Sequence, residues 1–167
     1  PSRGLGDVYK RQNLRMAKPD ATKEEMEAVL QKVNLLGFLQ TQNGLQTELL
    51  EKAGNLSGGQ CQRLVIARAL LRSDSAVYIF DEAASNIDVE SEELIMNVIH
   101  ELAKTKTVLL ISHRLANVVQ SDQIYFLKNG TICERGTHAE LMEQNGAYRH
   151  LYDSQMVLEN YGKEGNA

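Results

Sequence analysis

Two neighbouring carboxylates follow a short apolar run near the middle of the 167-residue chain. Asp81 and Glu82 come directly after residues 77–80, which are rich in side chains that favour β-strands. Ligand sites in parallel α/β sheets lie beyond the carboxyl ends of the strands, and successive side chains of a strand point to opposite faces. One carboxylate could therefore approach a metal ion while the other approaches a water molecule. For an Asp-Glu pair alone, a solvated turn is the simpler interpretation.

A second candidate site is a glycine-containing turn before an amphipathic segment. Ser57 can cap the start of a helix, and Gln60 stands where it would complete a capping box. Gly58 and Gly59 would leave backbone N–H groups uncovered at the electropositive end of that helix. Such a helix start can bind phosphate, although an ordinary capped helix with two glycines is the alternative.

A histidine follows the next apolar run. His113 comes after residues 107–112, which predict another strand, and its imidazole could donate to a phosphate at neutral pH. A lone histidine is more often structural. We assign that ordinary role, on a helix surface or at a cap, to His100, His138 and His150.

The order of these motifs resembles the ATPase cassette of the ABC (ATP-binding cassette) family. Residues 56–60 (LSGGQ), followed by Gln62 and Arg63, are similar to the family's signature motif, although Cys61 stands where a basic residue is usual. The resemblance implies that residues 57–60 reach across a head-to-tail dimer to the γ-phosphate of ATP held by the other subunit.

Residues 77–82 resemble the Walker B motif of the same family. The resemblance implies that Asp81 helps to hold Mg²⁺ through water, that Glu82 polarises the attacking water, and that His113 is the switch histidine. Ser85 and Asp88 match the D-loop that lines the dimer interface, and Asp88 can also cap a helix.

Other segments resemble exporters within the family. Residues 47–51 are similar to the X-loop, with Glu51 as its acid and Leu50 where glycine is usual. Residues 128–130, 134–141 and 146–148 resemble the end of exporter-type cassettes.

The elements that must position these residues follow from periodicity and caps. Thr22 with Glu25 predicts a capped helix with an apolar face, and Thr137 with Glu140 predicts another. Asn129-Gly130 between two apolar runs predicts a hairpin. The alternation of strands and helices predicts an α/β fold with a mostly parallel sheet. With the resemblance, it implies a truncated P-loop NTPase (RecA-like) core with parallel strands plus the ABC α-helical subdomain.

This organisation divides the chain into four segments. Residues 13–72 form the helical subdomain with the signature motif, residues 73–160 form the carboxyl-terminal part of the ATPase core, and residues 161–167 form a frayed tail. Residues 1–12 lack any period and resemble a translated sequencing-adapter scar, so we expect a non-native, disordered segment.

A phosphate-binding P-loop of the pattern G-x-x-x-x-G-K-[ST] does not occur in the sequence. Its backbone and lysine hold the β- and γ-phosphates of ATP in P-loop enzymes. We therefore expect the parent protein to bind and hydrolyse ATP, and this chain by itself to do so barely or not at all.

Composition narrows the class of partner. The formal net charge is −4 and the basic residues are spread among acids, which argues against nucleic acid as a partner. Two distant cysteines, Cys61 and Cys133, suggest reduced thiols in the cytosol. No apolar run is long enough to cross a bilayer, so a membrane-spanning part would lie elsewhere.

The expected function is that of the nucleotide-binding domain of an ABC exporter, using ATP and Mg²⁺. The expected partners are a second cassette, in a homo- or heterodimer, and a transmembrane domain upstream on the same chain, at the cytoplasmic face of the plasma (inner) membrane. The alternatives are a soluble ABC ATPase without a transport role, or a degenerate cassette with a structural role.

Overall fold

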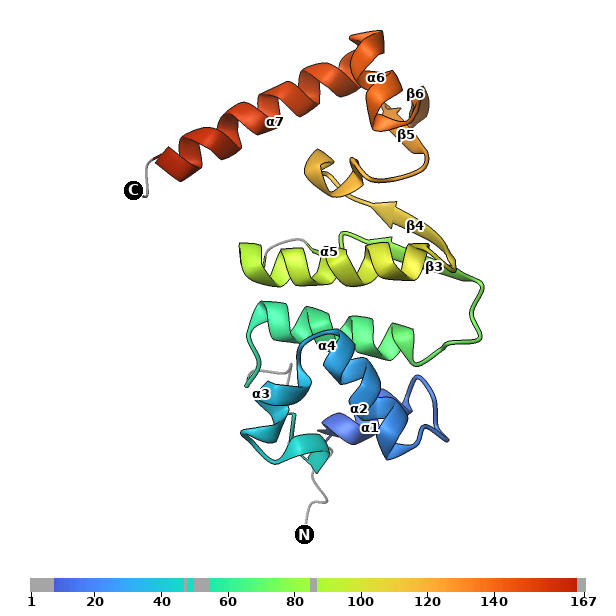
Figure 1. Cartoon of the computed structure of the whole chain (residues 1–167), viewed down its shortest axis with the longest axis vertical. Helices are drawn as coiled ribbons and strands as arrows, with labels where there is room; N and C mark the ends of the chain where they lie inside the picture. Colours follow the sequence, from blue (N-terminus) through green and yellow to red (C-terminus); the bar gives the residue numbers. More distant parts are fainter. Residues whose placement is uncertain (1–7, 47, 50–54, 85–86, 165–167) are drawn as a thin grey trace. The chain divides into compact units, whose positions relative to one another are not determined.

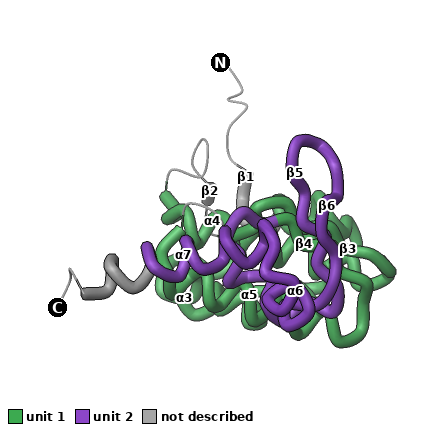
Figure 2. The backbone as a smooth tube through the Cα atoms, turned by 90° about the horizontal axis from the view of Figure 1, so that it is seen from above, with its two compact units in different colours: residues 1–111 green, residues 112–167 purple. Residues whose placement is uncertain are grey.

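The computed structural model describes residues 8–46, 48–49, 55–84 and 87–164 (Figure 1). The chain divides into two compact units, residues 1–111 and 112–167 (Figure 2). Within the described ranges, no helix combines the length and apolar character needed to cross a membrane.

The first part of unit 1 is mainly helical. Its capped helix α2 (Lys23–Lys32) begins at Thr22, whose side chain and that of Glu25 form the predicted capping box. The other elements of this part are β1 (Val8–Tyr9), α1 (Lys10–Arg15), α3 (Leu36–Gln40), the 3₁₀ turn η1 (Gly44–Gln46), β2 (Glu48–Leu49) and α4 (Gly58–Leu70).

A closed apolar core holds these helices together. Leu14 of α1, Met26 and Leu30 of α2, and Leu39 of α3 are fully buried, and they share one cluster with Leu64 of α4. The predicted stripes of α2 and α4 are therefore confirmed as core faces. Each fully buried leucine or methionine contributes about 1.5–3 kcal/mol through burial of its apolar side chain.

The expectation of disorder throughout residues 1–12 is wrong for residues 8–12. Val8 and Tyr9 pair antiparallel with Leu49 and Glu48, and the chain continues directly into α1. Strand pairing between segments 40 residues apart supplies backbone hydrogen bonds that the local sequence gives no sign of. Residues 1–7 lie outside the described part of the chain.

The second part of unit 1 is a parallel pair of strands beside a helix. β3 (Val77–Asp81) pairs in parallel with β4 (Thr107–Ile111), as predicted, and the crossover between them is α5 (Val89–Ala103). Tyr78 and Phe80 of β3 belong to the same core as Ile95 and Ile99 of α5.

The core of unit 1 covers only one face of these two strands. Burial alternates along β3, so that Val77 is 55% exposed and Ile79 is 65% exposed. Leu109 and Ile111 of β4 are also exposed. Successive side chains point to opposite faces, and the core of unit 1 covers only the face that carries Tyr78.

Unit 2 contains an antiparallel hairpin and two helices. β5 (Ile124–Lys128) and β6 (Thr131–Gly136) are joined at Asn129 and Gly130, which have φ angles of 52° and 77°. Positive φ at both central residues is the mark of the tight turn that Asn-Gly favours, so the predicted hairpin is confirmed. The remaining elements are the 3₁₀ turn η3 (Leu115–Val118), α6 (His138–Gln144) and α7 (Ala147–Glu164).

The last helix is longer than predicted. α7 continues to Glu164, whereas the sequence suggested a frayed tail from residue 161. Elongating an existing helix costs little once its first turns have formed. At its start, the Glu134 carboxylate accepts from the N–H groups of Ala147 and Tyr148, at 2.6 and 3.0 Å.

Candidate functional site

The candidate phosphate site lies at the start of α4. The Ser57 side chain accepts from the Gln60 N–H at 3.2 Å, and the Gln60 side chain accepts from the Ser57 N–H at 3.0 Å. The predicted capping box is therefore confirmed. The N–H groups of Gly58 and Gly59 occupy the first two helical positions, where no intrahelical acceptor exists. Because the Ser57 oxygen accepts within the cap, its own proton can still be donated to a ligand.

Gly59 brings the starts of two helices into contact. A Cβ built at Gly59 would lie 2.7 Å from the Cβ of Ser91 and closer still to its Oγ, and 3.2 Å from Oδ2 of Asp88. Asp88 and Ser91 begin α5, so the glycine allows the capped start of α4 to pack on the capped start of α5. The expectation of an uncovered backbone holds for Gly58, which is exposed, but not for Gly59, which is buried against the start of α5.

Arg63 links this helix start to α2. Its guanidinium donates to the carbonyl of Gly59 at 3.3 Å and to the carbonyl of Asn34 at 3.0 Å. Asn34 has a φ of 50° and follows the end of α2. The arginine therefore holds the turn after α2 against the first turn of α4.

Asp88 caps α5, as predicted. Its carboxylate accepts from the Ser91 N–H at 2.8 Å. This backbone hydrogen bond, followed by one from the Ser91 side chain, lowers the pKa of Asp88 below its usual value, and the charge of Arg63 adds a smaller effect in the same direction. Asp88 is thus an anionic cap beside the candidate phosphate site.

The two carboxylates lie at the carboxyl end of β3, where the sequence placed them. Asp81 is the last residue of the strand, and Glu82 follows it with its N–H donating to the carbonyl of Ile111 at 2.9 Å. Both residues are exposed. Glu82 has a φ of 49°, a left-handed conformation that is uncommon outside glycine and asparagine. Strain of this kind costs on the order of 1–3 kcal/mol and clusters at functional sites.

Beyond Glu82 the chain turns into the core. Ala83 and Ala84 are buried, so this turn is anchored immediately after the two exposed acids. Asp81 and Glu82 can therefore project from a fixed strand end. No group of three or more potential metal ligands occurs among the described residues. A single carboxylate still suits Mg²⁺, which commonly keeps several waters and shares its other ligands with a phosphate.

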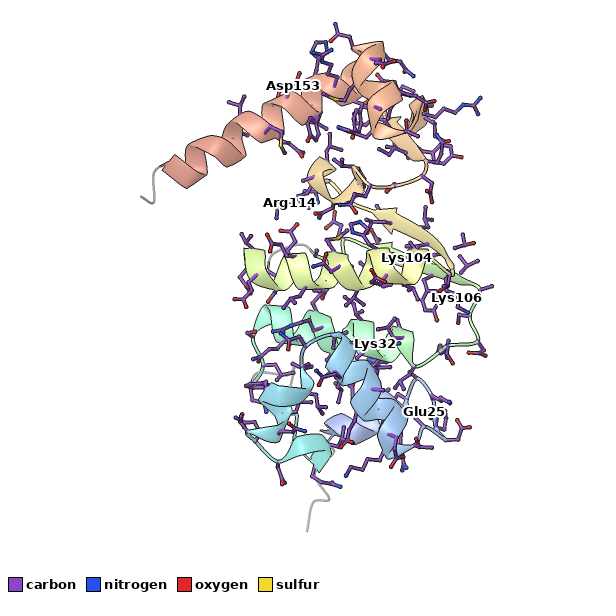
Figure 3. All side chains as sticks on the ribbon, viewed as in Figure 1. Glu25, Lys32, Lys104, Lys106, Arg114 and Asp153 are labelled. Atoms are coloured by element: carbon purple, nitrogen blue, oxygen red, sulfur yellow. The ribbon has the colours of Figure 1, made fainter. Side chains whose placement is uncertain are left out.

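His113 is exposed on the loop that opens unit 2. Gln155 of α7 donates to the His113 carbonyl at 2.7 Å and accepts from the Leu115 N–H at 2.9 Å. Figure 3 marks these two segments by Arg114, which follows His113, and by Asp153, two residues before Gln155. The Ser112 Oγ accepts from the Arg114 N–H at 3.0 Å.

The structure thus brings part of the predicted site together. Ser57, Gly59 and Asp88 share the junction of α4 and α5 in unit 1, and Asp81 and Glu82 end a strand of the same unit. Ser85 and Glu51, predicted in the D-loop and the X-loop, lie outside the described residues.

Two residues at the site escaped the sequence reasoning. Ser91 lies in α5 and Gln155 in α7, and neither stands in a recognisable motif. Their contacts, Ser91 with Gly59 and Gln155 with the loop of His113, join segments about 30 to 40 residues apart and have no local signal.

Comparison with known proteins decides the family. The profile of a family described as "ABC transporter" matches residues 5–85. An uncharacterized ABC transporter ATP-binding protein of Haemophilus influenzae is 51% identical over 157 residues, which are 94% of this chain and 28% of that protein. The chain belongs to the ABC transporter family. The ABC profile begins within the stretch of residues 1–12 that the sequence suggested to be foreign.

Further relatives agree with the exporter type of the cassette. An ATP-dependent lipid A-core flippase of Mannheimia succiniciproducens is 46% identical over 140 residues, covering 83% of this ABC chain and 24% of the flippase. The solved structure of a bacterial Atm1-family ABC exporter with ATP bound matches with a TM-score of 0.80 at 30% identity, over 88% of this chain and 26% of the exporter. The predicted fold class, an α/β ATPase core with a helical subdomain, is thereby confirmed.

The ABC chain spans about a quarter of the length of these relatives, 28% of one and 24% of another. What the longer proteins do therefore bears on this chain as a proposal.

Proposed function

We propose that this chain is part of the nucleotide-binding domain of an ABC exporter that couples ATP binding and hydrolysis to transport. The observation that carries the proposal is the junction of α4 and α5 in unit 1. There the start of α4, which resembles the signature motif, packs on Asp88, which belongs to the segment that resembles the D-loop. Support comes from the 0.80 TM-score to an ABC exporter with ATP bound.

The start of α4 binds the γ-phosphate of ATP held by a second cassette. The Ser57 hydroxyl donates its free proton, and the N–H of Gly58, which is exposed, donates beside it. The positive end of the helix adds an electrostatic contribution of about 0.3–1 kcal/mol for an exposed anion. Gln60 holds the Ser57 backbone, so the hydroxyl stays aligned.

The end of β3 orients the attacking water. Glu82 accepts a hydrogen bond from that water and is held by the bond from its own N–H to Ile111. Asp81 holds Mg²⁺ through water, and the ion, when bound, neutralises negative charge on the phosphates. His113 donates to the γ-phosphate from the loop after β4.

The partners follow from the same reasoning. A second cassette completes each ATP site head to tail, and a transmembrane domain upstream on the same chain receives the motion through the X-loop acid Glu51. The protein then works at the cytoplasmic face of the inner membrane. The names of the relatives, a lipid A-core flippase and an ABC exporter, support this arrangement.

The experiment is a Glu82→Gln substitution in the full-length protein encoded at the source locus. Because the amide orients water poorly as a base, we expect ATP turnover to fall about 10²–10⁴-fold with ATP binding retained. Steady-state phosphate release and equilibrium binding of labelled ATP measure the two quantities.

Glu93→Gln is the matched control, since Glu93 is an exposed acid on α5 outside every predicted motif. Its turnover should equal that of the unmodified protein. Turnover that survives Glu82→Gln unchanged would remove Glu82 from the role of base, and an unmodified protein that neither binds nor hydrolyses ATP would overturn the proposed function.

A further inference from the structure

The side-chain amide of Gln155 brackets the backbone around His113. Its Nε2 donates to the carbonyl of His113 at 2.7 Å, and its Oε1 accepts from the N–H of Leu115 at 2.9 Å. The helix α7 thus contacts a loop 40 and 42 residues earlier in the chain, and both segments belong to unit 2.

The two hydrogen bonds fix the loop in a way that one could not. A primary amide presents a donor and an acceptor on one rigid plane, so it satisfies a carbonyl and an N–H two residues apart at the same time. The Ser112 hydroxyl accepts from the Arg114 N–H at 3.0 Å, which adds a local hydrogen bond to the same loop. Leu115 is buried just beyond, which anchors the end of the bracketed segment.

The His113 backbone is therefore tied while its side chain stays exposed. A side chain that must meet a phosphate needs a fixed Cα and a fixed direction of its Cα–Cβ bond. Gln155 touches the carbonyl of that same residue, so it restrains the peptide plane that sets this direction. A displacement of about 1 Å in a catalytic group can cost on the order of 10²-fold in rate.

We infer that Gln155 is a positioning residue for His113: it holds the switch loop so that the imidazole reaches the γ-phosphate in the hydrolytic state. This inference rests on the proposed function, and it adds to it a role for the last helix of the chain. Both hydrogen bonds of the Gln155 amide go to backbone atoms of the loop, so its effect on catalysis passes through His113.

The test uses the full-length protein with two substitutions of different severity. Gln155→Met keeps the length of the side chain and removes both hydrogen bonds, whereas Gln155→Glu keeps the acceptor for the Leu115 N–H and loses the donor for the His113 carbonyl. We expect Gln155→Met to lower kcat about 10-fold and to change the KM for ATP by less than about 2-fold. The kcat of Gln155→Glu should lie between that of Gln155→Met and that of the unmodified protein.

Ser154→Ala is the matched control on the same helix. The Ser154 hydroxyl donates to the His150 carbonyl within α7, so its loss perturbs the helix without touching the loop. Its kcat should stay within about 2-fold of the unmodified value, in line with the small effects of surface substitutions. Hydrogen exchange of the Leu115 amide measures the loss of its hydrogen bond to Gln155 directly. The exchange rate should increase in Gln155→Met and stay unchanged in Ser154→Ala.

A double-mutant cycle separates positioning from general stabilisation. If Gln155 acts through His113, then Gln155→Met should cause no further loss in a His113→Ala background, because coupled residues are not additive. The same 10-fold loss in both backgrounds, or an unchanged kcat in the single variant, would overturn the inference. An unmodified protein without ATPase activity would instead contradict the proposed function, so the two failures are distinct.

Discussion

The helical part of unit 1 and its β3–β4 sheet differ in how completely they are covered. Leu14, Met26 and Leu30 are fully buried in the helical part, whereas one face of the sheet exposes Val77 and Ile79. Both parts contribute to a single core through the other face of the sheet. The helical part thus has a closed interior, and the strand that ends in Asp81 has an interior on one side only.

This difference matters for the two halves of the candidate site. The start of α4 is fixed by a local capping box and by the contact of Gly59 with Ser91, both within closely packed helices. The position of Glu82 depends on β3 pairing with β4, because its N–H donates to Ile111 at the end of that ladder. We therefore expect the capped turn at the start of α4 to be more robust than the end of β3.

The largest effect should come from truncating the closed core. Leu30→Ala removes a fully buried side chain and should lower the free energy of unfolding by about 2–5 kcal/mol. Ile79→Ala on the exposed face should change it by no more than about 0.5 kcal/mol. Urea unfolding of the chain, followed by helical circular dichroism, measures both.

A polar substitution sharpens the same contrast. Because Ile79 is 65% exposed beside other apolar side chains, Ile79→Thr should raise the concentration at which the chain aggregates. Equal destabilisation by Leu30→Ala and Ile79→Ala would show that the outer face of the sheet is buried in solution. It would contradict the proposed difference in burial between the helical part and the sheet.

The next effect concerns the junction of the two capped helices. Gly59→Ala should destabilise the chain by about 1–3 kcal/mol, because the new Cβ would overlap Ser91. Gly37→Ala is the control, since a Cβ there meets nothing within 4 Å and alanine favours the helix by about 0.5–1 kcal/mol. Differential scanning calorimetry should give shifts of opposite sign.

A second substitution tests the cause of the Gly59 effect. Ser91→Gly removes the two nearest atoms that the alanine would meet, so the Gly59→Ala variant should regain stability in that background. Additive losses in the double variant would place the cost of Gly59→Ala elsewhere.

Local signals explain what the sequence could predict. The caps at Thr22, Ser57, Asp88 and Thr137 all form as expected, because each depends on residues no more than three positions apart. The same holds for the hairpin turn at residues 129–130. The capped turn at the start of α4 could therefore be located from the sequence alone.

Long-range pairing explains what the sequence missed. The pairing of β1 with β2, and the bracket of Gln155 on the His113 loop, join segments far apart in the chain and leave no period behind. The exposed face of β3 also depends on long-range packing. A continuous apolar run predicts burial on both faces, but only the partner layers decide whether each face is covered.

The smallest effect compares the two helix caps at the site as the pH falls. The Ser91 N–H holds the pKa of Asp88 below its usual value, so the folded state binds this proton less readily than the unfolded state. The stabilisation from Asp88 is then complete above about pH 4, the ordinary aspartate value, and is lost as the pH falls through the lowered pKa. Asp88→Asn should be less stable than the unmodified chain at pH 7, with the difference shrinking below pH 4.

Ser57→Ala removes the uncharged cap of the adjacent helix and supplies the contrast. Its cost of about 1 kcal/mol should be the same at pH 7 and pH 3, because no proton is bound or released. Urea unfolding of the three proteins across this range measures the differences. Parallel pH profiles for Asp88→Asn and the unmodified chain would show that the Asp88 charge does not stabilise α5. The junction of α4 and α5 would then depend on the contact of Gly59 with Ser91 rather than on an anionic cap.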